Sequence, residues 1–486
     1  MRNGEVDEPV RLSWGSVALY VLLIGSAIGG FYALRTLGRG LTAPAPTRPE
    51  LFGTGDAKVK FDALLHVLLA LAVVIVTARL LGTLFARFRQ PAVIGEVLAG
   101  ILLGPSLLGR VAPQVSGYLL PMNVAPFLSV LAQVGVILYM FLVGLELDTN
   151  LLRKRTHATV AVSHASIVVP FLLGCTLALL LYPRVASSDV PFTYFALFCG
   201  VAMSVTAFPV LARILTDRGV QTTRLGVTAL ACAAVDDVTA WCLLAFVVSV
   251  VKARAAGGLL TVGLTGGFIA LMVLGVRPLL LRLVRTHERT GDVNKTVLTA
   301  VLVGLLFSSL ATEYIGIHAV FGAFALGAII PSESKIAKEL LHRLEDFVVV
   351  LFLPAFFAYT GMRTQVGLLS SATEWLLCLL IIITACVGKF GGSFVAARLT
   401  GMAWRDSAAL GVLMNTRGLM ELIVLNIGLD LRVISPTLFA MLVIMAIVTT
   451  MATTPLLDLL TAGMERKPRA VRAPLQPRIS GDETAI

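Results

Sequence analysis

Two adjacent carboxylates, Asp236 and Asp237, lie inside an apolar stretch, residues 225–251, that contains no other charged side chain. A carboxylate at bilayer depth costs about 2.5–3.5 kcal/mol on insertion scales. Two adjacent carboxylates would not persist in a membrane helix unless they served a function. The pair therefore predicts that a cation, a proton or both bind near the middle of a membrane.

Lys389 is the best candidate partner for this pair, because it too lies in the middle of an apolar segment. Glycines surround it in the sequence ITACVGKFGG, residues 383–392, and would allow close helix approach. Burial favours the neutral forms of these groups, whereas their proximity favours the charged forms. A balance between the two effects would let protons exchange near neutral pH. The alternative is a static ion pair, which leaves the second carboxylate unneutralised.

Other charges inside apolar segments carry less weight. Arg417 and Glu421 are four residues apart and can pair across one helical turn. Glu96 lies near a predicted span end, where it is either a gate residue or solvated at the interface. The six cysteines all fall inside predicted spans, without the spacing of a disulfide framework or a zinc site. No resident metal or cofactor is expected.

The composition predicts an all-α, polytopic membrane protein. Of the 486 residues, 57% are hydrophobic and 14% are charged, against about 25% charged in soluble domains. One span needs about 20 mostly apolar residues. About fourteen segments qualify, near residues 13–34, 63–85, 92–108, 125–145, 157–182, 192–216, 222–250, 257–281, 296–312, 316–331, 346–362, 374–397, 406–428 and 433–460.

The net charge of +11 is a topology signal rather than the mark of a nucleic-acid partner, because the basic residues are dispersed among short loops. Loops rich in them, such as residues 153–155, alternate with loops that hold a single Arg110 or Arg184. By the positive-inside rule the rich loops and both termini are cytoplasmic. We expect an integral protein of a bacterial inner membrane.

Three regions follow along the chain. Residues 1–62 would form an extra helix, near 13–34, and an extracytoplasmic linker; a retained helix is favoured over a cleaved signal because its apolar stretch is long for one. Residues 63–460 would form the membrane domain. Residues 461–486 form a tail too short to fold alone. We expect the tail to be disordered and no nucleotide-binding regulatory domain to be fused.

The membrane domain shows weak internal similarity. Residues 95–105 resemble 322–331, and 141–148 parallel 358–365, which indicates one repeat near 92–250 and another near 316–460. On the topology above, the repeats run in opposite directions, as in many transporters.

Two spans in corresponding positions carry helix-breaking residues. The span at 192–216 contains Ser204, Thr206 and Pro209, and the span at 406–428 contains Asn415 and Thr416 with Arg417, Gly418 and Glu421. Unwound backbone at this depth is tolerated only where it is buried or lines a cavity. We therefore expect two broken helices that cross near the Asp pair.

These residues together make the chain resemble the monovalent cation:proton antiporter-2 family, within the sodium/proton exchanger superfamily. The matching motifs are QPAVIGEVLAGILLGP at 90–105, FLVGLELD at 141–148, TAFPVLARIL at 206–215, the Asp pair, and NTRGLMELIVLNIGLD at 415–430. The similarity runs from about residue 63 to 460. The Asp pair and the last motif look closest to bacterial relatives of the plant cation/proton exchangers.

The resemblance implies an antiporter-like fold, a homodimer, and a core domain that moves against a scaffold domain. It implies that Asp237 binds the ion and the proton, that Asp236 pairs with Lys389, and that Thr206 lies at the crossing. The chain departs from the plant branch, which usually has Asn at position 236. An Asp pair with Lys389 is instead similar to electrogenic bacterial antiporters. Arg417 also stands where lysine is common.

The expected function is secondary active exchange of Na⁺ or K⁺ for H⁺, with the cation at Asp237 and Asp236. Two alternatives remain: a sodium-coupled organic-anion symporter of related crossed-helix plan, and a channel-like cation pathway. An intramembrane aspartyl protease is disfavoured, because the adjacent Asp236 and Asp237 lie on one predicted helix, so no enzyme is expected. The residues leave the choice of cation and the exchange ratio open.

Overall fold

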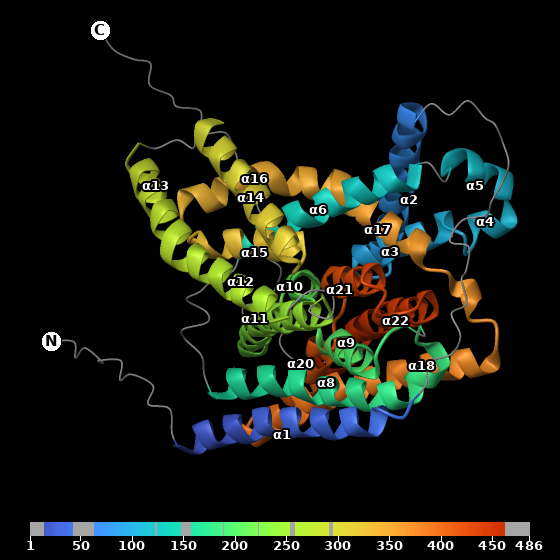
Figure 1. Ribbon diagram of the computed structural model, residues 1–486, viewed down its shortest axis with the longest axis vertical. Coiled ribbons are helices and arrows are strands. Elements are labelled where there is room, and N and C mark those ends of the chain that lie inside the picture. The colour runs from blue at the N-terminus through green and yellow to red at the C-terminus, as the bar shows by residue number, and fades with distance from the viewer. Residues whose placement is uncertain are drawn as a thin grey trace, which may run out of the picture.

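The computed structural model describes residues 14–41, 63–121, 124–146, 157–187, 189–221, 223–252, 258–290 and 295–461. Within these ranges every regular element is a helix (Figure 1). The predicted linker, from residue 42 to 62, and the predicted tail, beyond Thr461, lie outside the described residues. The extra N-terminal helix is present as α1 (Trp14–Gly38), which lies alongside α8 (His157–Val185).

Eleven helices among the described residues are long and apolar enough to cross a membrane, or twelve if one bent pair counts as a single span. The expectation of fourteen is therefore corrected. The segment at 316–331 forms only the eleven-residue helix α15 (Ala319–Ile329). The segment at 346–362 is divided between a short π-helix, η3 (Val348–Phe352), and α17 (Leu353–Arg363). Apolar composition alone did not register the short length of α15 or the π-helical turn before α17.

A first helix group packs around α3 (Ala92–Leu103) and α17. Its other members are α2 (Ala63–Arg87), α6 (Ala125–Glu146), α14 (Lys295–Ile315) and α15. Small residues allow the backbones to approach closely. A Cβ added at Gly361 would lie 2.4 Å from the Gly100 backbone, and one added at Gly327 would lie 2.3 Å from the Phe141 carbonyl oxygen.

A second helix group packs around α8 and contains both interrupted spans. Its other members are α9 (Phe192–Ser204), α10 (Phe208–Asp217), α11 (Arg224–Lys252), α18 (Ala372–Cys386), η5 (Val387–Gly391), α19 (Gly392–Leu399), α20 (Trp404–Met414), α21 (Leu419–Asp430) and α22 (Pro436–Thr461). In Figure 1, α9, α21 and α22 lie near the centre of the view, and α8 and α18 lie beyond them on the side that also carries α1.

The remaining elements lie around these two groups. They are α4 (Leu108–Val111), α5 (Pro113–Leu119), α12 (Gly258–Ala270), η2 (Leu271–Val276), α13 (Arg277–Thr290), α16 (Lys335–Phe347) and η4 (Val366–Leu368).

Both predicted interruptions are present, and they touch each other. Residues 205–207 separate α9 from α10, and residues 415–418 separate α20 from α21. The Ala207 amide donates to the Thr416 carbonyl oxygen at 3.0 Å, so the two breaks are joined by backbone. Only α20 and α21 bend sharply, by 42°, whereas α9 and α10 still count as one span. Of the two broken helices expected, one is a bent pair, and the other is an interruption within a straighter span.

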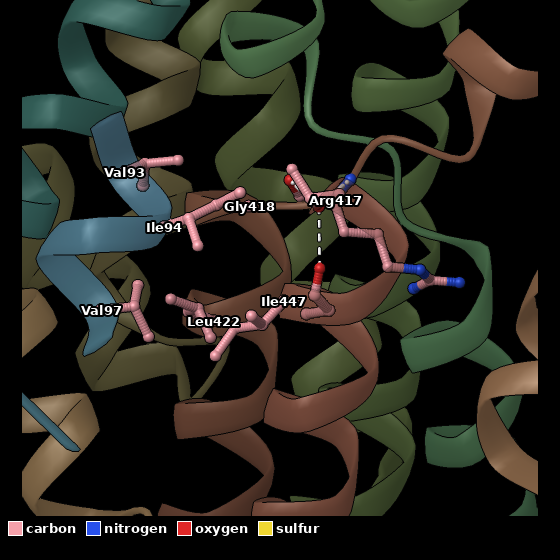
Figure 2. A pocket seen from close by; sticks show the side chains of 9 residues that line it. Val93, Ile94, Val97, Arg417, Gly418, Leu422 and Ile447 are labelled. Carbon is pink, nitrogen blue, oxygen red and sulfur yellow. Dashed lines mark hydrogen bonds between the residues drawn. The ribbon is translucent and has the colours of Figure 1, made fainter. Parts of the chain in front are cut away.

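The two helix groups meet at an apolar contact. Val93, Ile94 and Val97 of α3 face Leu422 of α21 and Ile447 of α22 across a cavity of about 20 Å³ (Figure 2). Such a space holds one water molecule at most, and its lining is apolar, so nothing there would retain the water. Several polar connections lie elsewhere: Asn426 Nδ2 donates to Thr360 Oγ1 at 2.8 Å, and Gln90 Nε2 donates to the Met451 carbonyl oxygen at 3.2 Å. Arg363 of α17 contacts Asp430 at 2.7 Å and the Asn426 side chain at 3.0 Å, both on α21.

We predict that Gly361→Ala destabilises the protein, because the new methyl group would overlap the α3 backbone. Overpacking of this kind costs about 1–3 kcal/mol. Thermal unfolding of the detergent-solubilised protein, followed by tryptophan fluorescence, measures the loss. Gly267→Ala is the matched control, since a Cβ there meets nothing within 4 Å. Equal melting temperatures for the two variants would contradict the packing described here.

Candidate functional site

Asp236 is completely buried and is held by four side chains of the second helix group. Ser163 Oγ donates to Asp236 Oδ1 at 2.6 Å, and Thr206 Oγ1 donates to Oδ2 at 2.9 Å. Ser166 Oγ also bonds Oδ2, and Lys389 Nζ lies 3.3 Å from the same oxygen. Three hydroxyl donors and one ammonium therefore surround this carboxylate.

Local structure explains how these groups converge. Ser163 and Ser166 are three residues apart on α8, so they lie on one face of that helix. Thr206 belongs to the break between α9 and α10. Lys389 sits in η5, a π-helical turn of the kind often found at functional sites. Its Nζ donates to Thr206 Oγ1 at 2.5 Å, so the threonine hydroxyl links the lysine to Asp236.

Asp237 has different surroundings. Successive helix residues point about 100° apart, so the second carboxylate cannot enter the same cluster. The Phe208 backbone amide, the first of α10, lies close enough to act on it electrostatically. That helix has no side-chain cap, and Pro209 occupies its first turn. A helix N-terminus carries a partial positive charge and unpaired N–H groups, which favour an anion there. Among the described residues no side chain is hydrogen-bonded to Asp237, in contrast to Asp236.

A second ion pair lies on the other side of the crossing. Arg417 and Glu421 are both completely buried and are 2.8 Å apart. The guanidinium also donates to the carbonyl oxygens of Ala202 at 2.8 Å and Met203 at 2.7 Å, in the last turn of α9. Arg417 thus neutralises the negative end of α9. It does more than pair along its own helix.

Of the remaining candidate residues, Asn415 and Thr416 lie at the crossing, whereas Ser204 and Glu96 are not hydrogen-bonded to the Asp236 cluster. Asn415 Oδ1 and Thr416 Oγ1 are buried at the crossing without a partner among the described residues. Ser204 donates to the backbone carbonyls of Ile167 and Gly200, and so acts within its own helix pair. Glu96 does not join the cluster, since it lies on α3 in the first helix group.

Ser163, Ser166 and the Phe208 amide were missed by the reasoning from sequence. The two serines looked like ordinary small residues in an apolar span, and only their three-residue spacing could have drawn attention to them. Backbone amides carry no sequence signal at all. The position of Pro209 just after Phe208 was the available hint, because proline favours the first turn of a helix.

The buried charges do not cancel. Within the described residues, five fully charged side chains are buried: Asp236, Asp237, Glu421, Lys389 and Arg417. Three carboxylates against two cations leave one net negative charge when all are ionised. One monovalent cation or one proton would therefore neutralise the site.

We predict that Lys389→Met strongly destabilises the protein, by about 3–5 kcal/mol, because it leaves Asp236 buried without a counter-charge. Adding Asp236→Asn should recover most of that loss. Chemical unfolding in detergent measures both. Lys338→Met is the control, since its pairing with Glu333 is exposed and such pairs contribute about 0–1 kcal/mol. A single Lys389→Met variant as stable as the native protein would contradict the ion pair.

The chain is similar to known proteins over most of its length. Residues 72–459 match the family described as sodium/hydrogen exchanger, transmembrane. The Na(+)/H(+) antiporter NhaS4 of Synechocystis is 45% identical over 81% of this chain and 97% of its own length. Cation/H(+) antiporter 20 of Arabidopsis thaliana is 40% identical over 79% of this chain. K(+)/H(+) antiporter 1 of Saccharomyces cerevisiae is 34% identical over the same share.

The matches differ in how much of each relative they cover. The chain spans about half the length of the plant and yeast relatives, 47% and 45%. The structure of the sodium proton antiporter MjNhaP1 from Methanocaldococcus jannaschii superposes with a TM-score of 0.59 over 83% of this chain and 98% of that one. At 16% identity this likeness shows the fold alone.

The predicted family is confirmed by the match over most of the chain, and so is the expectation that the protein is a transporter and not an enzyme. The crossed, interrupted helices and the buried carboxylates lie within the matched residues. The chain belongs to the sodium/hydrogen exchanger family of integral membrane proteins.

Proposed function

We propose that this protein exchanges a monovalent cation, Na⁺ or K⁺, for H⁺, and that Asp237 is the group for which the two compete. The difference between the two aspartates carries the proposal. Asp236 is engaged by four side chains, whereas Asp237 meets the amide end of α10 and is hydrogen-bonded to no side chain among the described residues. Asp236 is then the stationary anion that orients Lys389 and Thr206.

The net charge of the buried site supports one ion per cycle at this carboxylate. An empty site would carry a buried negative charge, which is costly to move through a low-dielectric barrier. Binding either a cation or a proton removes that charge. Competition for one carboxylate therefore couples the two fluxes, because only a loaded site crosses.

We further propose that the second helix group is the moving core domain and the first is the scaffold, with inverted repeats near 92–250 and 316–460. The apolar contact of Val93, Ile94 and Val97 with Leu422 supports sliding, since few hydrogen bonds would break there. The contacts of Arg363 on α21 would have to open. A homodimer with cytoplasmic termini in a bacterial inner membrane completes the proposal.

The names of the relatives include Na⁺, K⁺ and unspecified cations, so the proposal keeps both alkali ions as substrates. Asn415 and Thr416 contribute unpartnered oxygens close to the crossing and are proposed to line the path. Glu96 is proposed only as a peripheral gate residue, because it lies on the opposing helix group.

We predict that Asp237→Asn abolishes cation-dependent proton movement, because an amide cannot hold either ion as a counter-charge. Proton flux is measured with a pH-sensitive dye in proteoliposomes, with Na⁺ and K⁺ tested in turn and the membrane potential clamped.

Asp217→Asn serves as the control, since Asp217 is exposed and paired only with Arg213 across one turn of α10. It should leave exchange unchanged. Full exchange by the Asp237→Asn variant would overturn the proposal. So would flux without proton coupling, which marks a channel, or organic-anion uptake driven by sodium, which marks a symporter.

A further inference from the structure

The guanidinium of Arg417 is enclosed by oxygen atoms that resemble the ligands of an alkali cation. Ala202 O, Met203 O and Glu421 Oε2 lie within 2.7–2.8 Å of its nitrogens. Two of these are carbonyls at the C-terminal end of a half-helix, and the third is a carboxylate. Half-helix C-termini and unwound carbonyls are the groups that bind Na⁺ in many transporters. We call these three oxygens the Arg417 oxygen cage.

The cage has further capacity. Glu421 Oε1 is buried and has no partner among the described residues. Ala202, Met203 and Glu421 are each at most 1% exposed, so a cation in this position would be dehydrated and bound by protein oxygens. Without the guanidinium, the cage would hold one full negative charge and two carbonyl dipoles in a dry environment, which is strongly unfavourable unless a cation binds there or Glu421 takes up a proton.

The backbone around Arg417 is held independently of its side chain. The Arg417 amide donates to Thr450 Oγ1 at 3.0 Å, and that hydroxyl donates to the Arg417 carbonyl oxygen at 2.8 Å. The neighbouring Thr416 carbonyl accepts from Ala207. Figure 2 shows the side chain extending away from the apolar pocket lined by Val97 and Leu422. Removing the guanidinium should therefore leave the cage in place.

Arg417 differs from Lys389 in one decisive respect. An arginine stays protonated in proteins, whereas a buried lysine can release its proton. The charge in the cage is therefore permanent. We propose that Arg417 is a tethered cation that fills a second alkali-cation site at the crossing, and so restricts the carrier to one transported cation per cycle. This inference rests on the proposed function in assigning the transported cation to Asp237.

The test counts bound cations. Purified protein in detergent is titrated with ²²Na⁺ or ⁸⁶Rb⁺, the latter as a probe for K⁺, and the number bound per chain is measured. We expect one for the native protein, two for Arg417→Met and one for Arg417→Lys, which restores the tethered charge. Arg417→Met with Glu421→Gln should bind one, because the cage has lost its charge.

An Asp237→Asn background separates this inference from the proposed function. Asp237→Asn alone should bind no cation, and Asp237→Asn with Arg417→Met should bind one, in the cage. If Asp237→Asn alone still binds a cation, the assignment to Asp237 fails, and the extra cation gained with Arg417→Met still tests the cage. A folded Arg417→Met variant that gains no cation overturns the inference.

Stability gives a second readout if Arg417→Met folds poorly. A cation that enters the cage stabilises the folded state by mass action. The melting temperature of this variant should then rise with NaCl or KCl, and not with N-methylglucamine chloride at equal ionic strength. The double variant with Glu421→Gln should lose that response. Equal effects of the three salts on Arg417→Met would overturn the proposal.

Discussion

Interrupted helices at bilayer depth leave backbone dipole ends in a medium that cannot solvate them, and the site depends on how these ends are compensated. Asp237 meets the amide end of α10, and Arg417 meets the carbonyl end of α9. Glu421 lies in the first turn of α21, where an anion is favoured. The C-terminal end of α20 is approached by Thr206, which donates weakly to the Met414 carbonyl at 3.4 Å. The crossing is thus held by charges whose positions follow from helix polarity.

This compensation separates structural charges from exchangeable ones. Arg417 and Glu421 pair with each other and with the end of α9, although Arg417 Nε and Glu421 Oε1 have no partner among the described residues. Asp236 is bonded by hydroxyls and Lys389, and Asp237 joins neither cluster. A buried, hydrogen-bonded ion pair can be stable without binding a transported ion, because its opposite charges already compensate each other. The unequal hydrogen bonding of Asp236 and Asp237 supports the proposed exchange site more directly than their shared burial does.

Much of the site followed from residue types alone, and the reason is the low dielectric of the membrane. Asp236, Asp237 and Lys389 stood out because charges are rare in apolar spans. The fold class followed from composition, but the span count did not. Segments 316–331 and 346–362 are apolar enough to pass a hydropathy test, yet their helices are short or interrupted. Hydropathy measures transfer from water and says nothing about where a helix breaks.

The sequence by itself determined that carboxylates and a lysine would be buried together in a membrane, and that two spans would be interrupted near them. Only the tertiary structure decided which carboxylate was engaged. That choice depends on the direction of two side chains about 100° apart on α11, and on Ser163 and Ser166 of a different helix. The contact of Arg417 with α9 was likewise visible only in the tertiary structure. Contacts between segments more than 200 residues apart leave no local pattern in one sequence.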